Sequence, residues 1–244
     1  MAPNTRSPYT MPHIPPMDEK TTVQERVYRT LRAAIMTGRF KPGHSVTIRG
    51  LADEMQVSSM PVREFLRRLI SERALTLKPN RRIEVPAMTM ERFEELTAAR
   101  VALETLAARR AFTTSQKAGT LHELAQHLEI IDADQDQAIT QGDWEGYLQK
   151  NLDFHFTLYA AARSDVTVPL IESLWLQIGP FLYLTRESLG VIYNEDRHKE
   201  AVAALRAGDE AALAHAIEQD IRDGMGSLPR DKLPFRSARE DPSA

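Results

Sequence analysis

Cysteine is absent from this chain of 244 residues. Its absence excludes disulfide bonds, cysteine-rich zinc sites and a thiol nucleophile, and it fits an expected cytoplasmic location. The sequence also has no run of the roughly 18 to 20 apolar residues that a membrane span requires, so we expect no membrane partner. The first twenty residues lack the apolar core of a signal peptide. With 42% hydrophobic residues, the chain has enough apolar material for one large or two modest folded domains.

Proline content and charge divide the chain into four parts. Residues 1–19 and 229–244 are rich in proline and polar residues, and we predict that they are disordered tails. Residues 20–87 contain 14 Lys and Arg against 6 Asp and Glu, whereas residues 88–228 contain 12 against 23. Chance variation in charge between solvated helices is the alternative explanation of this asymmetry. A basic segment joined to an acidic one instead favours nucleic acid as the partner of the first.

The basic segment has the pattern of a helix-turn-helix. Apolar residues recur every four positions from Val23 to Ile35 and predict an amphipathic helix, which the turn TGRFKPGH ends. We expect a short extended piece at 45–48. A second short helix is predicted from Leu51, and a third begins near Pro61 after the turn QVSS. In a helix-turn-helix the helix after the turn lies in the major groove.

The stretch VSSMPVREFLRRL is the predicted recognition helix. Pro61 suits a first helical turn because its missing N–H would have had no partner there. Ser58 or Ser59 can accept a hydrogen bond from the exposed backbone amides. Arg63 is placed on the first turn, where it can reach a base edge, most naturally as a bidentate donor to guanine.

Further basic residues are predicted to contact the DNA backbone. Arg67 and Arg68 lie farther along the recognition helix, where phosphates are the expected partners. The following stretch ALTLKPNRRIEVPA alternates on either side of a turn and predicts a small β-wing. Three residues of this wing are expected to contact the backbone or the minor groove: Lys78, Arg81 and Arg82. Any one of these arginines alone is more often part of a solvated face, but helix order, proline and wing together favour DNA binding.

The run from Val27 to Val85 resembles the winged-helix domain of GntR-type bacterial transcription regulators. The resemblance is carried by LRAAIMTGRFKPG, IRGLADEMQVSSMPVREFLRRL and PNRRIEV. It implies that Arg49 and Arg63 contact operator DNA. The chain departs from the family at Ser59, Met60 and Arg82, where the family usually has arginine, threonine and glycine. Ser59 and Met60 are therefore included among the candidate DNA contacts, and a different operator sequence is implied.

Residues 88–228 are predicted to form an antiparallel all-α bundle of about six helices. The helical runs are 90–112, 115–138, 143–162 and 167–189, with two more on either side of RAGD between Asp196 and Met225. The predicted fold is therefore mostly α, with a winged helix-turn-helix before the bundle. The layout is similar to the FCD domain of FadR-like regulators, with a helix number nearer the VanR type. This resemblance implies effector binding and dimerisation.

Four polar residues lie on otherwise apolar faces of these predicted helices. Asn151 and His155 share one helical face, and His198 and Asp220 interrupt the apolar stripes of the last two helices. An unpartnered buried polar group costs about 1 to 3 kcal/mol, and a charge costs more. Binding a divalent cation of the Zn, Ni or Mn type would avoid this cost. Taken singly, each is more often a hydrogen-bonded core residue.

The FCD resemblance implies the same metal site with altered ligands. Metal-binding members carry Asp-x-x-x-His followed by two later histidines. Here Asn151 takes the acid position, His155 and His198 match, and Asp220 stands where the last histidine is expected. This ligand set leaves three possibilities open: weaker metal binding, preference for a harder ion, or direct binding of the effector without metal.

Arg100 matches a family position associated with the effector pocket. An inward guanidinium can bind a carboxylate through two parallel hydrogen bonds. An ion pair with Glu104 one turn away explains the residue equally well. A cavity with both a metal and Arg100 would select a small carboxylate, such as an organic or sugar acid.

These features predict a ligand-responsive transcription regulator and not an enzyme. We expect a repressor that binds a palindromic operator in double-stranded DNA as a homodimer and is released or re-oriented by a small carboxylate. Two alternatives are a metal-dependent enzyme housed in the bundle, because two histidines and an aspartate can activate water, and a DNA-binding protein with an inactive pocket.

Overall fold

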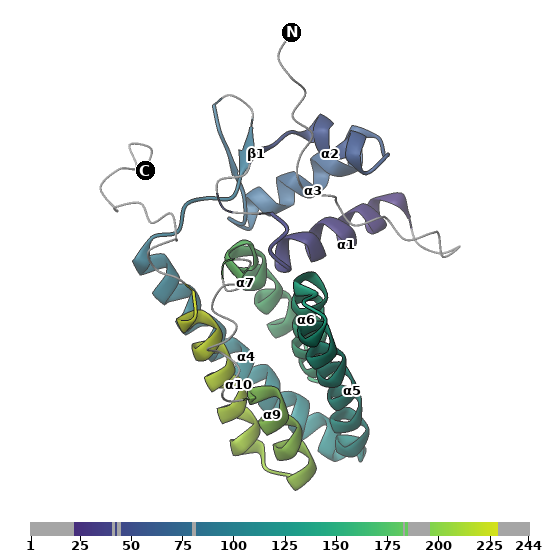
Figure 1. Ribbon diagram of the computed structural model, residues 1–244, viewed down its shortest axis with the longest axis vertical. Helices are drawn as coiled ribbons and strands as arrows, with labels where there is room; N and C mark the ends of the chain where they lie inside the picture. Colours follow the sequence, from purple (N-terminus) through teal and green to yellow (C-terminus); the bar gives the residue numbers. More distant parts are fainter. Residues whose placement is uncertain are drawn as a thin grey trace.

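The computed structural model describes residues 22–40, 42, 45–79, 82–182, 184 and 196–228. A small head and a long helical body lie end to end (Figure 1). The head consists of α1 (Val23–Met36), β1 (Ser45–Val46), α2 (Ile48–Glu54), α3 (Ser59–Ser71), β2 (Thr76–Leu77) and β3 (Ile83–Glu84). The body consists of α4 (Met90–Ala118), α5 (Leu121–Thr140), α6 (Trp144–Ala160), α7 (Thr167–Leu182), α9 (Arg197–Ala207) and α10 (Glu210–Gly226). The predicted mostly helical fold with a small β-wing is confirmed.

The head is a three-helix unit with a three-stranded antiparallel sheet in the order β1-β3-β2. The Thr22 side chain caps α1 by accepting a hydrogen bond from the Glu25 amide. From Val27 onward the predicted stripe of α1 is buried, with Val27, Leu31 and Ile35 fully enclosed. The wing is confirmed: Leu77 pairs with Ile83, and the β1 strand adds to the other edge of β3. Arg81 lies outside the described residues.

Two predictions for the head are wrong in detail. Helix α2 begins at Ile48 and not at Leu51, because the Thr47 hydroxyl accepts a hydrogen bond from the Gly50 amide at 3.0 Å and starts the helix there. The extended piece therefore ends at Val46. Ser58 occupies the cap position of α3 but makes no side-chain capping hydrogen bond, so the expected serine cap is not formed.

The body is a bundle in which α4 is the longest element. It contacts α5, α6, α7 and α10, so it forms the spine of the bundle. Helix α4 continues to Ala118, and Gly119 ends it in the left-handed region with φ 72°. The run 115–138 is largely the next helix, as predicted, but its first residues belong to the end of α4, and α5 begins at Leu121. The part of the predicted fourth helix beyond Leu182 falls, except for residue 184, outside the described residues. Of the helices that could be described, none is both long and apolar enough to cross a membrane.

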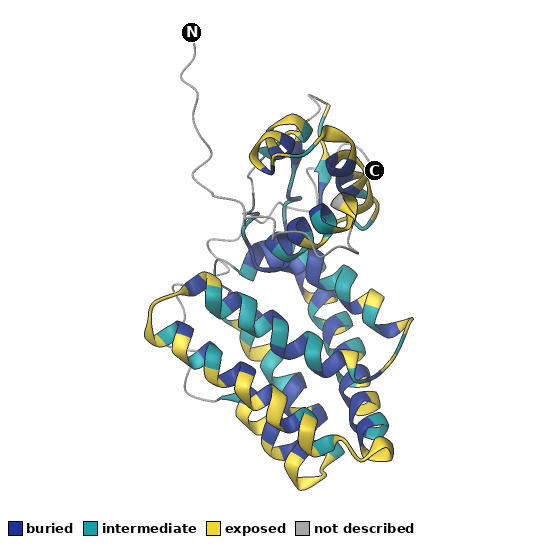
Figure 2. Ribbon diagram, turned by 90° about the vertical axis from the view of Figure 1, so that its right-hand side faces the viewer, coloured by how far each residue is buried: buried dark blue, intermediate teal, exposed yellow. Residues whose placement is uncertain are grey.

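The head rests on α7 of the body through a close backbone contact. A Cβ atom placed on Gly179 would lie 2.5 Å from the Ile35 carbonyl oxygen and 2.6 Å from the Met36 Cα, so only glycine allows α1 and α7 to approach this closely. Buried apolar residues of head and body form one continuous cluster, and Figure 2 shows burial continuing across the junction. The two parts are therefore packed together and not merely joined by a linker.

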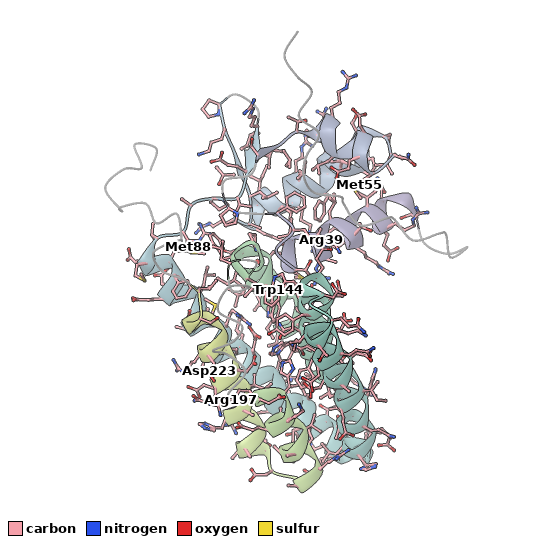
Figure 3. All side chains as sticks on the ribbon, in the orientation of Figure 1. Arg39, Met55, Met88, Trp144, Arg197 and Asp223 are labelled. Atoms are coloured by element: carbon pink, nitrogen blue, oxygen red, sulfur yellow. The ribbon has the colours of Figure 1, made fainter. Side chains whose placement is uncertain are left out.

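Polar contacts surround this apolar junction. Arg39 and Trp144 both lie there (Figure 3). The contacts are an ion pair of Arg32 with Glu172, an ion pair of Arg39 with Glu145 at 2.9 Å, and hydrogen bonds at 2.9 Å from Arg92 to the Arg73 carbonyl oxygen and the Gln177 side chain. Arg92, on α4, thus joins the turn after α3 to α7.

Candidate functional site

The predicted DNA-contacting residues of α2 and α3 are exposed on the surface of the head. Ser59, Met60 and Arg63 are exposed on the first turn and a half of α3, and the Met60 side chain is 62% exposed. Arg49 is exposed on the first turn of α2, where it pairs weakly with Asp53 at 3.8 Å. Within the described part of the chain, no ion pair or side-chain hydrogen bond engages Arg63. This arginine is therefore available to a base edge without breaking an internal contact.

The remaining basic residues of the head differ in how firmly the protein holds them. Arg67 pairs with Glu64 at 3.3 Å on an open surface, which is a weak interaction. Arg68 is more constrained, because its guanidinium donates to Glu72 at 2.9 Å and lies 4.7 Å from the ring centre of Tyr28. In the wing, Lys78 pairs with Glu84 at 2.7 Å, and Arg82 is exposed. Arg67 is thus a better candidate for a phosphate contact than Arg68.

In the body, three of the four predicted metal ligands converge. Their elements are α6 for His155, α9 for His198 and α10 for Asp220. His155 Nε2 lies 3.1 Å from Asp220 Oδ2, and His198 Nε2 lies 3.8 Å from Asp220 Oδ1. The potential ligand atoms of all three residues lie within 4.8 Å of one another. Both histidines are buried, with 1% and 5% exposure.

The outer nitrogens of both imidazoles are held by other side chains. His155 Nδ1 lies 3.1 Å from the Tyr159 hydroxyl, and His198 Nδ1 lies 3.3 Å from Asp132 Oδ1. The His198 ring also stacks on Phe154 with 3.8 Å between ring centres. His198 Nε2 is buried without a hydrogen-bond partner. Metal-binding histidines are oriented in this way, with one ring nitrogen bonded to an outer partner and the other directed at the ion.

The residues present fit a divalent cation. Two imidazole nitrogens and one carboxylate form a ligand set that binds Zn and other transition metals. Asn151 lines the same cavity as His155 and Asp220, one helical turn before His155, so its amide oxygen is the fourth candidate ligand. A cation here would also give the unpartnered His198 Nε2 its missing partner.

Charge interactions among these groups shift their pKa values in opposite directions. Burial alone would raise the pKa of the Asp220 carboxyl, but the positive charge and hydrogen bond of His155, with the charges of His198 and Arg100, lower it to about 2. Burial lowers the pKa of His198, and the hydrogen bond to Asp132 and the charge of Asp220 outweigh this effect and raise it. Burial and the charge of Glu104 raise the pKa of Tyr159 well above its usual value, so its hydroxyl keeps its proton.

A cavity of about 80 Å³ borders the ligand cluster. Arg100, Asn151, Trp175 and Arg197 line it together with His155 and Asp220. Arg100 makes the predicted ion pair, donating to Glu104 at 2.7 Å, and it also borders the cavity; its role toward an effector stays a prediction. Its guanidinium stacks over Trp175 at 4.7 Å. Two of its five N–H groups donate hydrogen bonds to Glu104, which leaves the others for a ligand.

Several residues of this site were not predicted from the sequence. Arg197 lines the cavity from the start of α9 and pairs with Asp223 at 2.9 Å; the two residues are labelled near each other in the body in Figure 3. Its position next to His198 was the only local sign of its role. The indole N–H of Trp175 is buried without a hydrogen-bond partner. Of the outer partners, Glu104 on α4 was predicted only as the ion-pair partner of Arg100, and Asp132 and Tyr159, on α5 and α6, gave no pattern that identified them.

A second group of acidic residues lies on the other side of His198, and unlike the first it contains a lysine ammonium. Asp132, Asp136 and Asp196 come close enough to hold an ion. The Lys199 ammonium occupies the space between them, 2.6 Å from Asp196 and 2.8 Å from Asp136. The lysine neutralises the group, so we assign it a structural role.

A winged helix-turn-helix head on an all-helical body with a polar cavity is the architecture of a ligand-sensing DNA-binding protein. Comparison with protein-family models identifies the family. Residues 23–85 match the model "Bacterial regulatory proteins, gntR family", and residues 95–223 match the FCD domain. The chain belongs to the GntR family of bacterial transcription regulators, in the group with an FCD effector-binding domain.

Individual relatives agree with this assignment. The HTH-type transcriptional regulator McbR of Escherichia coli K12 is 27% identical over 83% of this chain and 91% of its own length. The solved structure of E. coli McbR/YncC has a TM-score of 0.76 at 25% identity, and the match covers 85% of this chain and 97% of that chain. The gluconate operon transcriptional repressor of Bacillus subtilis is 24% identical over 84% of each chain. Domains and relatives thus indicate a transcription regulator and not an enzyme.

Proposed function

We propose that the protein is a repressor that binds a palindromic operator as a homodimer and responds to a small carboxylate. The carboxylate binds in the body cavity, at a divalent cation held by His155, His198 and Asp220 with Asn151. When bound, the cation supplies a positive charge that the carboxylate can coordinate. Two recognition helices related by two-fold symmetry give the specificity that one small module lacks.

The observation that carries this proposal is the direction of the two imidazoles. Both turn Nε2 toward one carboxylate that stays ionised, and both have their other nitrogen held from outside. Arg100 and Trp175 border the same cavity, and the guanidinium and the unpartnered indole N–H are candidate donors for an anion; Arg197 adds a positive charge at the cavity. The name of the B. subtilis relative refers to a gluconate operon, and gluconate is a carboxylate.

Helix α7 is the element that we expect to carry the signal from cavity to head. Trp175 on one side of α7 lines the cavity and stacks on Arg100, and Gly179 one turn later contacts the backbone of α1. A ligand that moves Trp175 would therefore shift the surface on which the head rests. Ligand binding changes DNA affinity only to the extent that it prefers one arrangement of the two parts.

Arg63 and Arg67 should differ in their effects on DNA binding. Replacing Arg63 by alanine should weaken binding to DNA selected from a random pool by about 1 to 3 kcal/mol and relax the preferred sequence at one position. Replacing Arg67 by alanine should weaken binding to all sequences and reduce the salt dependence by one ionic contact. Equal salt slopes and an unchanged preferred sequence in both variants would contradict these roles.

Metal binding should stabilise the full-length protein. After removal of metals with a chelator, addition of Zn²⁺, Ni²⁺ or Mn²⁺ at 100 times its dissociation constant should stabilise the fold by about 2.7 kcal/mol. The shift should disappear in His155→Ala and His198→Ala. His215→Ala is the matched control, because this histidine is exposed on α10 outside the cavity and should leave the shift unchanged. Thermal melting with each metal measures the effect.

The same preparations distinguish the other two functions. Organic and sugar acids should raise the melting temperature further when metal is present and should change the affinity for selected DNA. A protein that binds DNA but responds to neither metals nor acids would be a regulator with an inactive pocket. Turnover of an acid that His155→Ala abolishes would favour the metal-dependent enzyme.

A further inference from the structure

A buried chain of hydrogen bonds leads from Arg100 to the metal ligand His155. Arg100 donates from Nε to Glu104 Oε1 at 2.7 Å, and the Tyr159 hydroxyl donates to Glu104 Oε2 at 2.7 Å. The same hydroxyl lies 3.1 Å from His155 Nδ1. Glu104 and Tyr159 are fully buried, and Arg100 is 4% exposed. Water therefore does not compete for these bonds, and each proton has a defined place.

The direction of each bond follows from counting hydrogens. Glu104 faces a guanidinium that is always charged, so its carboxylate is ionised and only accepts. Tyr159 has one hydroxyl hydrogen, and Glu104 takes it. The Tyr159 oxygen can then only accept a bond from His155, so Nδ1 must carry a proton. The charged ring carries a proton on both nitrogens; when it loses one to bind a cation, Nδ1 keeps its proton and the lone pair is left on Nε2, which faces Asp220.

Asp220 pulls the proton in the opposite direction. A carboxylate 3.1 Å from Nε2 favours an imidazole that carries its proton there and donates to it. That form would close Nε2 to a cation, because a metal ligand must offer a lone pair. Something must therefore hold the proton on Nδ1, and the Tyr159–Glu104 pair is placed to do so.

We propose that Tyr159 and Glu104 are positioning residues that fix the proton of His155 on Nδ1, keep Nε2 open for a cation, and so connect the effector-binding Arg100 to the metal ligands. This role rests on the proposed metal site. The two residues do not touch the cation but set the form of the ring that does. Outer partners of this kind typically change metal affinity by about 10- to 100-fold when altered.

Glu104→Gln is the most informative change because it keeps the shape of the side chain. Arg100 needs an acceptor, so the amide oxygen should face Arg100 and the amide NH₂ should face Tyr159. The Tyr159 hydroxyl must then donate to His155 Nδ1, and the ring proton moves to Nε2. Tyr159→Phe removes the acceptor altogether and should have the same result. Both variants should bind Zn²⁺ about 10- to 100-fold more weakly than the natural protein in a chelator competition.

Proton position is the measurement that a merely structural role would not change. Two-bond ¹H–¹⁵N NMR spectra of the neutral histidines in the metal-free protein distinguish the two ring forms. His155 should carry its proton on Nδ1 in the natural protein and on Nε2 in both variants. Arg100→Lys should retain the Nδ1 form, because lysine keeps Glu104 ionised. Tyr28→Phe, which removes a hydroxyl in the head, should change neither the spectrum nor the Zn²⁺ affinity.

The outcomes separate this role from the metal site itself. A natural protein with the Nε2 form, or variants that keep both the Nδ1 form and the natural Zn²⁺ affinity, would overturn the positioning role. A natural protein that binds no Zn²⁺ would overturn the proposed metal, and the ring spectra would still decide where the His155 proton lies.

Discussion

Replacing Gly179 by alanine should destabilise the protein by about 1 to 3 kcal/mol and loosen the head from the body. The new Cβ would meet the Ile35 carbonyl oxygen at 2.5 Å, with the Met36 Cα and carbonyl oxygen at 2.6 and 2.8 Å. All three are backbone atoms, so no side chain can turn aside to make room. Helices α1 and α7 must therefore move apart, which breaks the apolar junction. Urea denaturation measures the loss of stability, and small-angle scattering measures the change in shape.

The expected loss of stability is opposite in sign to the effect of the same substitution in an open helix, so the test is specific. Alanine is a better helix former than glycine, so the same change in an open helix should stabilise by up to about 1 kcal/mol. Gly224 in α10 is the matched control, because a Cβ there would have no neighbour within 4 Å. If Gly179→Ala stabilised the protein as Gly224→Ala does, the close contact between α1 and α7 would be refuted. The expected coupling between the cavity and the head through α7 would then also be contradicted.

Replacing Arg100 by methionine should cost about 3 to 5 kcal/mol, because it leaves a buried carboxylate without its partner. Glu104 is fully buried, and Arg100 is its only ion-pair partner among the described residues. The remaining hydrogen bond from Tyr159 cannot compensate for a lost charge. Denaturant titration of the metal-free protein measures this loss apart from any effect on ligand binding.

The double variant Arg100→Met/Glu104→Gln should recover most of the lost stability, because the uncharged amide keeps the hydrogen bond to Tyr159. The ion pair between Arg206 and Glu129 is the surface control. Both side chains are about half exposed, so Arg206→Met should change the stability by less than about 1 kcal/mol. A single Arg100 variant as stable as the Arg206 variant would show that Glu104 is not buried as a charge.

The sequence alone was sufficient for the class of protein and the order of the helices, and it identified three polar residues that the structure brings together. Charge separated a basic from an acidic part, and four-residue periodicity located α1 because its buried stripe is local in sequence. His155, His198 and Asp220 were identifiable since each interrupts an apolar helical face. Local boundaries were less well predicted. Thr47 starts α2 three residues early, although a threonine before a helical run is a readable capping signal.

Only the tertiary structure decided how these residues act together. Tyr159 and Glu104 are 55 positions apart, and His198 and Asp132 lie on α9 and α5, so no periodicity relates them. The contact of Gly179 with α1 is equally nonlocal. Periodicity reports which face of a helix is buried because that depends on near neighbours in the chain. Which atoms meet across the buried space depends on how the helices pack, and that packing places Tyr159 and Glu104 beside each other and Gly179 against α1.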